Sequence, residues 1–219
     1  MKIAVLGTGM VGKRLADGFL ARGHEVIMGA RDPANAVAHD WAAGAGKAAC
    51  AGDFAEAARW GEIVVLAVRG EHAVEAVRLA GGDASLKGKI LVDVTNPLDF
   101  SRGFPPFLTE GLNNTSSVGE AVQAAAPLAR VVKTLNTVSN LVMTDPGRLA
   151  EPTDLFVCGN DADAKAEVAG LLAGFGWRPP IDLGGIEAAR GTEAWLLLWT
   201  RLFGALGTAD MNLRIVRAA

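Results

Sequence analysis

The first residues whose types and spacing could do chemistry are three glycines near the N-terminus. They lie in the segment Gly7-Thr8-Gly9-Met10-Val11-Gly12, directly after the apolar run Lys2–Leu6 and at the start of an amphipathic stretch. In this context Gly7 permits a tight turn, Gly9 lets the backbone approach a pyrophosphate, and Gly12 lets a helix pack closely on the strand. The N–H groups and the positive end of that helix would face the phosphate charge. The motif therefore predicts a dinucleotide-binding loop.

The end of the next apolar run, Glu25–Met28, indicates which dinucleotide binds. Proteins that bind NAD usually carry Asp or Glu there, to accept a hydrogen bond from the ribose 2′-hydroxyl. This chain has the small Ala30 followed by Arg31, whose guanidinium can pair with the 2′-phosphate of NADP. Asp32 would repel that phosphate, but its place before Pro33 is also typical of a helix N-cap. The pattern favours NADP, and Asp32 leaves the use of NAD open.

Polar residues follow three further apolar runs, and in a parallel sheet these ends meet at one edge. The segments are Ala67-Val68-Arg69-Gly70-Glu71-His72, Thr95-Asn96-Pro97 and Lys133-Thr134-Leu135-Asn136-Thr137. The amides of Asn96 and Asn136 could bind a nicotinamide carboxamide or a ring carbonyl, or could bond only to neighbouring backbone. His72 and Asn136 are the candidate catalytic residues, with neither assigned, and Lys133 is a weaker candidate acid. Hydride transfer needs positioning more than acid–base chemistry.

The elements that would position these residues form an alternating pattern. Runs rich in Val, Ile and Leu, typical of strands buried on both faces, alternate with amphipathic helical stretches. The expected strands are Lys2–Leu6, Glu25–Met28, Ile63–Val68, Lys89–Val94, Ala129–Leu135 and Asp154–Cys158. The expected helices are Val11–Ala21, Ala34–Ala43, Phe54–Trp60, His72–Leu79, Gly119–Ala126 and Ala162–Phe175. This order predicts an α/β fold, a Rossmann-type doubly wound and mostly parallel sheet.

Two segments depart from this alternation. Residues 96–115 contain prolines and glycines and predict a long loop, which in a compact domain is usually functional. Residues 186–216 predict a small C-terminal helical portion, broken or kinked near Gly204 and Gly207. We therefore expect an NADP-binding domain over 1–183 and a C-terminal portion over 184–219. The aromatic face of that portion would pack either on the body of the domain or on a second copy, as a homodimer contact.

The bulk composition excludes several classes of protein. The net charge is −3 in 219 residues, without blocks of like charge, which argues against nucleic-acid or membrane-surface binding. Cys50 and Cys158 are far apart and predict free thiols in a reducing cytosol, and no metal-ligand spacing appears. The apolar run at 195–199 is far shorter than the roughly 20 residues of a membrane span. We expect a cytoplasmic protein that binds neither membrane nor metal.

Several motifs together resemble the F420-dependent NADP oxidoreductase family. They are the glycine loop, Gly23-His24-Glu25-Val26-Ile27-Met28-Gly29-Ala30-Arg31, Glu71-His72-Ala73, Val131-Val132-Lys133-Thr134-Leu135-Asn136-Thr137 and Leu155-Phe156-Val157-Cys158-Gly159-Asn160-Asp161. The resemblance implies hydride transfer between NADPH and the deazaflavin coenzyme F420. It implies that Thr8, Met10 and Val11 line the cofactor loop and that Arg31 takes the 2′-phosphate. Around the nicotinamide and the acceptor it implies Val68, Arg69, His72, Asn96, Pro97, Asn136 and Thr137, with Leu206 and Gly207 closing the crevice.

Two residues depart from the family pattern. Ala30 replaces a frequent serine, and Gly70 replaces a large aromatic residue before Glu71-His72. The chain is also similar to the cytosolic domains of ferric and cupric reductases, which use a flavin, and more distantly to pyrroline carboxylate reductases. We therefore expect an NADP-linked oxidoreductase with F420 or a flavin-like small molecule as electron acceptor. The alternatives are an NADPH-dependent ferric or flavin reductase and a non-catalytic module that senses NADPH.

Overall fold

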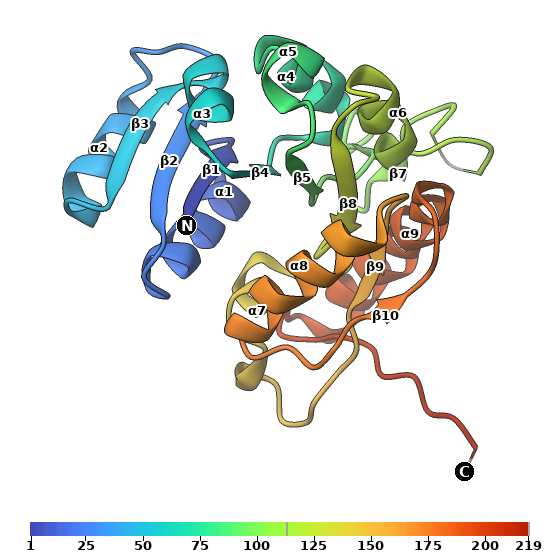
Figure 1. The fold of residues 1–219 in the computed structure, drawn as a ribbon. Coiled ribbons are helices and arrows are strands. Elements are labelled where there is room, and N and C mark those ends of the chain that lie inside the picture. Colours follow the sequence, from blue (N-terminus) through green and yellow to red (C-terminus); the bar gives the residue numbers. More distant parts are fainter. Residues whose placement is uncertain (113, 219) are drawn as a thin grey trace.

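The computed structural model describes residues 1–112 and 114–218. Its first half contains β1 (Lys2–Leu6), α1 (Met10–Leu20), β2 (Glu25–Ala30), α2 (Ala36–Ala45), β3 (Ala49–Asp53), α3 (Phe54–Trp60), β4 (Ile63–Leu66), α4 (Ala73–Leu79), α5 (Asp83–Leu86) and β5 (Ile90–Asp93) (Figure 1). Its second half contains β6 (Leu98–Asp99), β7 (Phe107–Leu108), α6 (Val118–Ala125), β8 (Arg130–Thr134), α7 (Asn140–Met143), β9 (Phe156–Cys158), α8 (Ala162–Gly174), β10 (Ile181–Asp182) and α9 (Ala189–Leu206). Short 3₁₀ turns lie at Gly70–His72, Pro146–Arg148 and Ile186–Ala188.

The main sheet has eight strands in the order β10-β9-β8-β5-β4-β1-β2-β3. All neighbours from β3 to β8 run parallel, and β1 lies between β2 and β4, where the winding direction changes. The predicted Rossmann-type fold is confirmed. The carboxyl ends of β1, β2, β4, β5 and β8 consequently share one edge of the sheet, where ligands bind in such folds.

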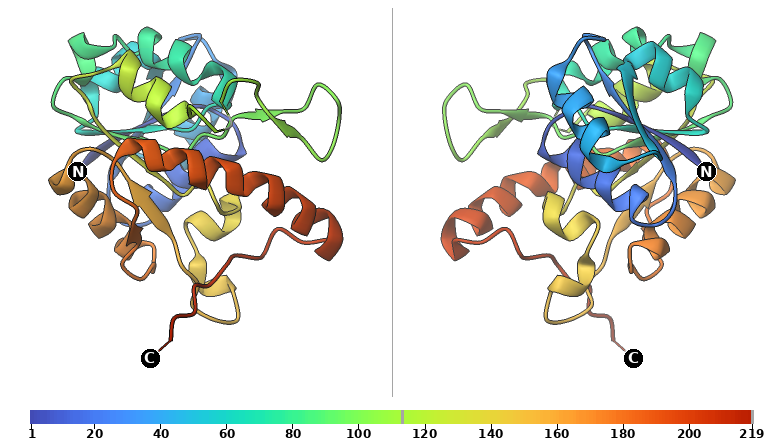
Figure 2. Two further views of the ribbon diagram at one scale, coloured as in Figure 1. Left: turned by 90° about the vertical axis from the view of Figure 1, so that its right-hand side faces the viewer. Right: turned by 90° about the vertical axis from the view of Figure 1, so that its left-hand side faces the viewer.

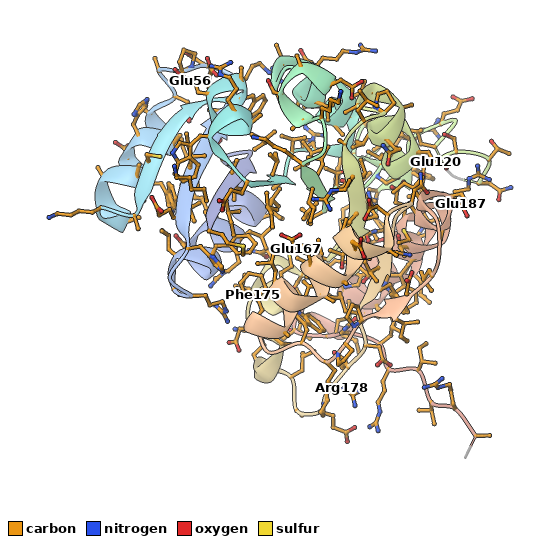
Figure 3. All side chains as sticks on the ribbon, viewed as in Figure 1. Glu56, Glu120, Glu167, Phe175, Arg178 and Glu187 are labelled. Atoms are coloured by element: carbon orange, nitrogen blue, oxygen red, sulfur yellow. The ribbon has the colours of Figure 1, made fainter. Side chains whose placement is uncertain are left out.

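Both faces of the sheet are covered, which explains why its inner strands β1, β4 and β5 are buried and almost entirely apolar. Along β1, Ile3 and Val5 belong to one buried cluster, and Ala4 and Leu6 belong to the other. The first cluster packs under α1, α2, α7 and α8, and the second under α3, α4, α5 and α6. At the end of α8, Phe175 packs against Phe19 of α1, with ring centroids 5.0 Å apart (Figure 3).

The sheet changes direction at β9, which pairs antiparallel with β8 through Lys133↔Cys158 and Thr134↔Val157. β10 then pairs parallel with β9. Four strands lie outside the expected set: β3, β10, and β6 and β7, which pair with each other. The pair forms a hairpin that projects from the body within the segment expected to be a loop (Figure 2).

The C-terminal helix ends at Gly207, one of the two glycines where a break was expected, and residues 208–216, which were included in the expected helical portion, form no helix. α9 ends at Leu206 because Gly207 adopts the left-handed conformation, with φ of 66°, and its N–H bonds to the carbonyl of Phe203. The following residues are extended (Figure 2). Backbone and side-chain bonds hold this tail to Asp154, and the division at 183/184 stays a prediction.

Candidate functional site

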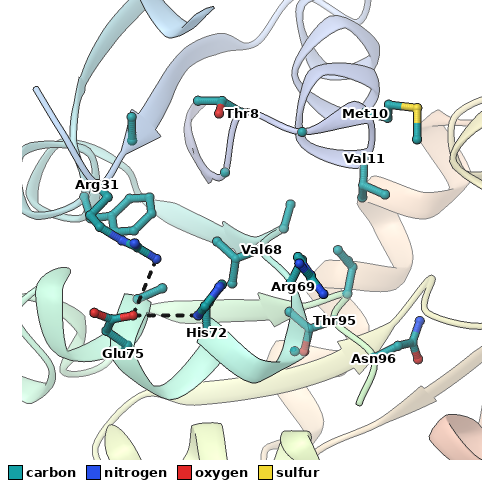
Figure 4. Close-up of a pocket in the computed structure, with 18 of the residues that line it drawn as sticks. Thr8, Met10, Val11, Arg31, Val68, Arg69, His72, Glu75, Thr95 and Asn96 are labelled. Atoms are coloured by element: carbon teal, nitrogen blue, oxygen red, sulfur yellow. Dashed lines mark hydrogen bonds and ion pairs between the residues drawn. The ribbon is translucent and has the colours of Figure 1, made fainter. Parts of the chain in front are cut away.

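A cleft of about 460 Å³ opens at the carboxyl ends of β1, β2, β4 and β5 (Figure 4). Twelve of the predicted site residues line it: Gly7, Thr8, Gly9, Met10, Val11, Ala30, Arg31, Ala67, Val68, Arg69, His72 and Asn96. Four others, Gly12, Pro97, Asn136 and Thr137, lie outside its lining. Of these four, Gly12 supports the cleft by packing and Asn136 by a hydrogen bond, as described below.

The glycine loop shapes one end of the cleft. Gly7 has a φ of 130°, which favours glycine, and its N–H bonds to Gly29 O at 2.9 Å. A Cβ at Gly12 would collide with the carbonyl of Gly7, so this glycine allows the helix to approach the loop. A Cβ at Gly9 would meet no protein atom within 4 Å. The space beside Gly9 is therefore open to a ligand.

The N-terminus of α1 fits a phosphate group. Its N-cap is Gly9, without a side-chain hydrogen bond, and its first turn holds no acidic residue. The first N–H groups of a helix need partners, and the helix dipole favours an anion there. The uncapped turn borders the cleft and suits the pyrophosphate of a dinucleotide, which agrees with the prediction from the glycine motif.

At the ribose end, Arg31 lies beside two ionisable side chains of the opposite wall. Its Nη2 is 3.5 Å from Glu75 Oε2, and His72 Nδ1 is 3.9 Å from the same atom (Figure 4). The Arg31 side chain is 59% exposed, so it can turn toward a bound phosphate. Glu75 is a competitor for this guanidinium that sequence reasoning missed.

The expectation that Asp32 caps the next helix was wrong. α2 begins at Ala36, and its N-cap is Asn35, whose side chain accepts from Ala38 N. Asp32 Oδ1 instead accepts from Ala34 N at 2.9 Å, in the turn that precedes the helix. One turn, closed by a bond from Asn35 N to Asp32 O at 3.0 Å, separates β2 from α2. Asp32 still has a local structural partner.

At the other end of the cleft, Asn96 and Asn136 bind each other. Asn96 Nδ2 donates to the backbone carbonyl of Asn136 at 2.8 Å, and Asn136 Nδ2 donates to Asn96 Oδ1 at 3.0 Å. Asn136 is 2% exposed, so of the two amides only Asn96 borders the cleft. A Cβ at Gly70 would collide with the carbonyl of Asn96. The close approach of two loops therefore requires glycine at position 70.

Residues behind the Asn96–Asn136 pair are also buried. Leu135 has a φ of 61°, a left-handed conformation that costs energy for a residue with a branched side chain. Thr137 is 2% exposed, and among the described residues its hydroxyl has no hydrogen-bond partner. The turn after β8 thus combines backbone strain with an unsatisfied polar group, as is common near functional sites.

Three charged side chains lie buried beneath this end of the cleft. Lys133 Nζ is 2.9 Å from Asp93 Oδ2 and 2.7 Å from Glu193 Oε1, and all three side chains are at most 1% exposed. Burial lowers the pKa of Lys133, but Asp93 and Glu193 outweigh it, so the net shift is upward. Lys133 is therefore a poor general acid. The sequence analysis did not identify Asp93 or Glu193, because no local motif marks them.

The remaining sequence predictions concern residues outside the cleft, metal binding and membrane spans. Cys158 is buried, which raises the pKa of its thiol to about 12, and Cys50 is half-buried. Leu206 is 59% exposed at the end of α9, and neither it nor Gly207 lines the cleft. In the described part of the chain, no three His, Cys, Asp or Glu gather as a metal site. No helix in that part is long and apolar enough to cross a membrane.

The fold is of the Rossmann type, and its cleft lies at the switch point of the sheet, where dinucleotides bind in such folds. The family model described as "NADP oxidoreductase coenzyme F420-dependent" matches residues 2–97. The F420-dependent NADP reductase of Methanothermobacter marburgensis is 30% identical over 202 residues, which cover 88% of each chain. The chain belongs to the F420-dependent NADP oxidoreductase family, as the sequence analysis predicted, and is thereby classed among the NADP-linked oxidoreductases.

The chain is also similar to two further proteins. A crystal structure from Arthrobacter sp. FB24, described as a candidate F420-dependent NADP reductase, is 48% identical. It matches 99% of this chain and 100% of that one with a TM-score of 0.92. Metalloreductase STEAP3 of Rattus norvegicus is 30% identical over 198 residues. The match covers 88% of this chain and 36% of STEAP3, so the chain spans about a third of that relative.

Proposed function

We propose that this protein transfers hydride between NADP(H) and the deazaflavin coenzyme F420. The carrying observation is the uncapped start of α1, which borders a cleft with Arg31 at one end and Asn96 at the other. The phosphate, ribose and nicotinamide of the dinucleotide would thus lie along a single cleft. The family relationship and the names of the relatives support F420 as the second substrate.

The residues of the cleft would divide the work of binding. The amides at the start of α1 would hold the pyrophosphate, and Arg31 would pair with the 2′-phosphate. Asn96, held by Asn136, would orient the nicotinamide end. When bound, NADPH would supply the hydride, and the reduced acceptor would take up one proton from solvent, so the main task of the protein's own residues would be to align the two rings.

The acceptor would lie against the hairpin side of the cleft. Leu98 at the start of β6 and Phe100 just beyond it line the cleft, and Phe100 is 46% exposed. Their apolar surfaces suit a flat ring system. In the same hairpin Phe104 contacts Phe203 of α9, with ring centroids 5.7 Å apart. Phe203 of α9 thus supports the hairpin.

A second candidate function is reduction of a flavin or, through it, of ferric ion. It is favoured by the similarity to STEAP3, which is named a metalloreductase. It is also consistent with Gly70, because the contact with Asn96 leaves no room for the aromatic side chain of well-known family members. The non-catalytic sensor remains the outcome to be excluded by experiment. We also predict that the protein is located in the cytoplasm and forms a homodimer through α9.

An acceptor screen separates these functions. The purified protein is mixed with NADPH and, in separate reactions, oxidised F420, FMN or ferric ion, and the absorbance of NADPH is followed. We expect F420 to oxidise NADPH fastest. Turnover with FMN and not F420 would establish the second candidate. Tight NADPH binding without turnover by any acceptor would contradict both enzymatic functions and support the sensor.

Arg31→Ala tests the choice of dinucleotide. The charge-assisted pair with the 2′-phosphate should contribute about 1.5–3 kcal/mol, so NADPH affinity should fall roughly 10- to 150-fold while NADH affinity changes little. Binding is measured by quenching of tryptophan fluorescence. In the matched variant Glu75→Gln, Arg31 loses its competitor, and NADPH should bind somewhat more tightly. Equal losses for NADPH and NADH in Arg31→Ala would overturn the NADP assignment.

A further inference from the structure

The buried cluster of Asp93, Lys133 and Glu193 is fully hydrogen-bonded. An ammonium group has three donors, and Lys133 Nζ directs them to Asp93 Oδ2, Glu193 Oε1 and the backbone carbonyl of Thr95 at 2.7–2.9 Å. Asp93 Oδ1 accepts from Thr95 N at 2.9 Å and from Thr95 Oγ1 at 2.7 Å. No donor of this lysine is left for a ligand, so the cluster acts on the site through other residues.

One side of the cluster fixes the backbone of Thr95, which lines the cleft. Lys133 and Asp93 together bind both the N–H and the carbonyl of Thr95, which lines the cleft. The next residue, Asn96, carries the amide that bonds to Asn136. The backbone at Thr95 therefore determines where the Asn96 amide lies.

The other side of the cluster holds α9. Glu193 Oε2 accepts from Val118 N at 2.9 Å, and Oε1 accepts from Gly119 N at 3.0 Å, at the start of α6. A Cβ at Gly119 would press on Ala189, so glycine allows α6 and α9 to pack closely. Glu193 is thus the one residue of this cluster that comes from α9, and it joins α9, α6 and Lys133 at one carboxylate.

Stability alone is a weak reason for such a cluster. Replacing a buried ion pair by apolar side chains is often neutral or stabilising, because desolvation offsets the attraction between the charges. Desolvation accordingly raises the pKa of Glu193, against the opposing effect of Lys133. What apolar side chains could not reproduce is the directed set of bonds to Thr95, Val118 and Gly119.

We propose that Glu193 is a positioning residue for the nicotinamide end of the cleft. It holds Lys133 in place, Lys133 and Asp93 hold Thr95, and Thr95 sets the Asn96 amide against the bound ring. The packing of α9 on α6 is thereby coupled to hydride transfer. This inference rests on the proposed function for its catalytic readout, and its binding readout is independent of the acceptor.

The test compares Glu193→Gln with Arg190→Gln. Arg190 makes a second link from α9 to α6. Its Nε and Nη2 donate to the two carboxylate oxygens of Glu120, at 2.9 and 2.5 Å (Glu120 is labelled in Figure 3). This pair lies at the surface and does not touch Lys133. In Glu193→Gln, one carboxylate oxygen becomes an amide nitrogen, which donates hydrogen bonds and cannot accept them. This nitrogen must face either a backbone N–H or Lys133, which are also donors, so the network is disrupted. Displacements of about 1 Å can slow a reaction by about 100-fold, and we expect kcat to fall 10- to 100-fold while the KM for NADPH rises only severalfold. Arg190→Gln should retain wild-type kcat.

The second readout is binding without turnover. Dissociation constants are measured for NADPH and for 2′-phospho-ADP-ribose, which lacks the nicotinamide. Glu193→Gln should weaken NADPH severalfold and leave the fragment within about twofold, whereas Arg190→Gln should change neither. These measurements remain informative if the acceptor screen shows no turnover, in which case the proposed function fails and this inference is still tested.

Two outcomes overturn the inference. One is an equal effect of Glu193→Gln and Arg190→Gln on kcat and on binding, which would make Glu193 an anchor of α9 only. The other is a parallel loss of NADPH and fragment binding in a folded Glu193→Gln protein. Should Glu193→Gln not fold, Glu193→Asp keeps the charge but shortens the reach. It should show a smaller loss of kcat with intact fragment binding, and wild-type kcat in that variant would contradict the inference.

Discussion

The two ends of the cleft are built in different ways. The phosphate end is local: Gly7, Gly9 and the first turn of α1 lie within one short segment, and Arg31 follows the next strand. The nicotinamide end is assembled from β5, β8 and α9, and Asn96 meets Asn136 across 40 positions of sequence. Local backbone chemistry suffices to bind a pyrophosphate. Orienting a ring takes a network that spans the chain.

This difference determines how each end should respond to mutation. At the phosphate end, a substitution should remove binding without disturbing the fold, because a Cβ at Gly9, which lines the cleft, would meet no protein atom within 4 Å. At the nicotinamide end, the same atoms support both the site and the protein core. Substitutions there should affect stability and catalysis together, and cofactor affinity less.

The largest effect is expected at the phosphate end, for Gly9→Ala. The new methyl group meets no protein atom, so the melting temperature should be unchanged, but it would occupy the space beside the pyrophosphate. We expect NADPH affinity to fall about 100-fold, or about 2.8 kcal/mol. Titration of tryptophan fluorescence and thermal melting measure the two quantities.

Gly12→Ala is the contrasting variant at the same end. Its methyl group would collide with the carbonyl of Gly7, so overpacking should lower the free energy of unfolding by about 1–3 kcal/mol. A Gly9→Ala protein as destabilised as Gly12→Ala would contradict the separation of binding from folding at this end.

At the nicotinamide end, Gly70→Ala should lower both stability and kcat. The methyl group must displace the backbone of Asn96, and we expect the free energy of unfolding to fall by about 1–3 kcal/mol. The affinity for 2′-phospho-ADP-ribose should be retained, because Arg31 and the glycine loop are untouched. Gly170→Ala in α8, where a Cβ meets nothing, is the matched control and should be neutral or slightly stabilising. Unchanged stability and kcat in Gly70→Ala would show that the two loops can separate freely.

The smallest effect is expected for the surface pair Glu120–Arg190. The hydrogen bond from Arg190 lowers the pKa of Glu120 below its usual 4.5. The pair therefore contributes stability above pH 4.5, and this contribution is lost as the pH falls through the lower, folded-state pKa. Because the pair is partly exposed, Glu120→Gln should cost only about 0.5 kcal/mol at neutral pH. Urea unfolding from neutral to acidic pH would measure this difference, which should vanish in acid; a constant difference would exclude the ion pair as its cause.

The sequence predicted best what depends on neighbouring residues. The parallel strands, the glycine loop and the place of Arg31 follow from apolar runs and turn chemistry, and the structure contains all of them. For α9 the sequence indicated a break near Gly204 or Gly207, and the helix ends at Leu206, but the expected helical portion was carried too far, to the apolar residues Ile215 and Val216. Asn35 was missed as the N-cap because Asp32-Pro33 carries a similar signal three residues earlier.

What could not be predicted depends on contacts between distant segments. Asp93 reads as the last residue of a buried strand, and Glu193 as an ordinary acidic residue of an amphipathic helix. Only the packing of α9 on α6 brings Glu193 to Lys133. Lys133 was considered only as a weaker candidate acid, although a charge inside an apolar strand also indicates a buried partner, without identifying that partner.

The reversal at β9 limits how far the cleft can extend along the sheet. Since β9 runs against β8, its carboxyl end emerges on the opposite edge from the glycine loop and Asn96. The turn at residues 159–161 is therefore remote from any bound dinucleotide. A peptide tag or a fluorescent label grafted into this turn would leave the entrance to the cleft clear. The same graft into the turn after β4 or β5 would obstruct it.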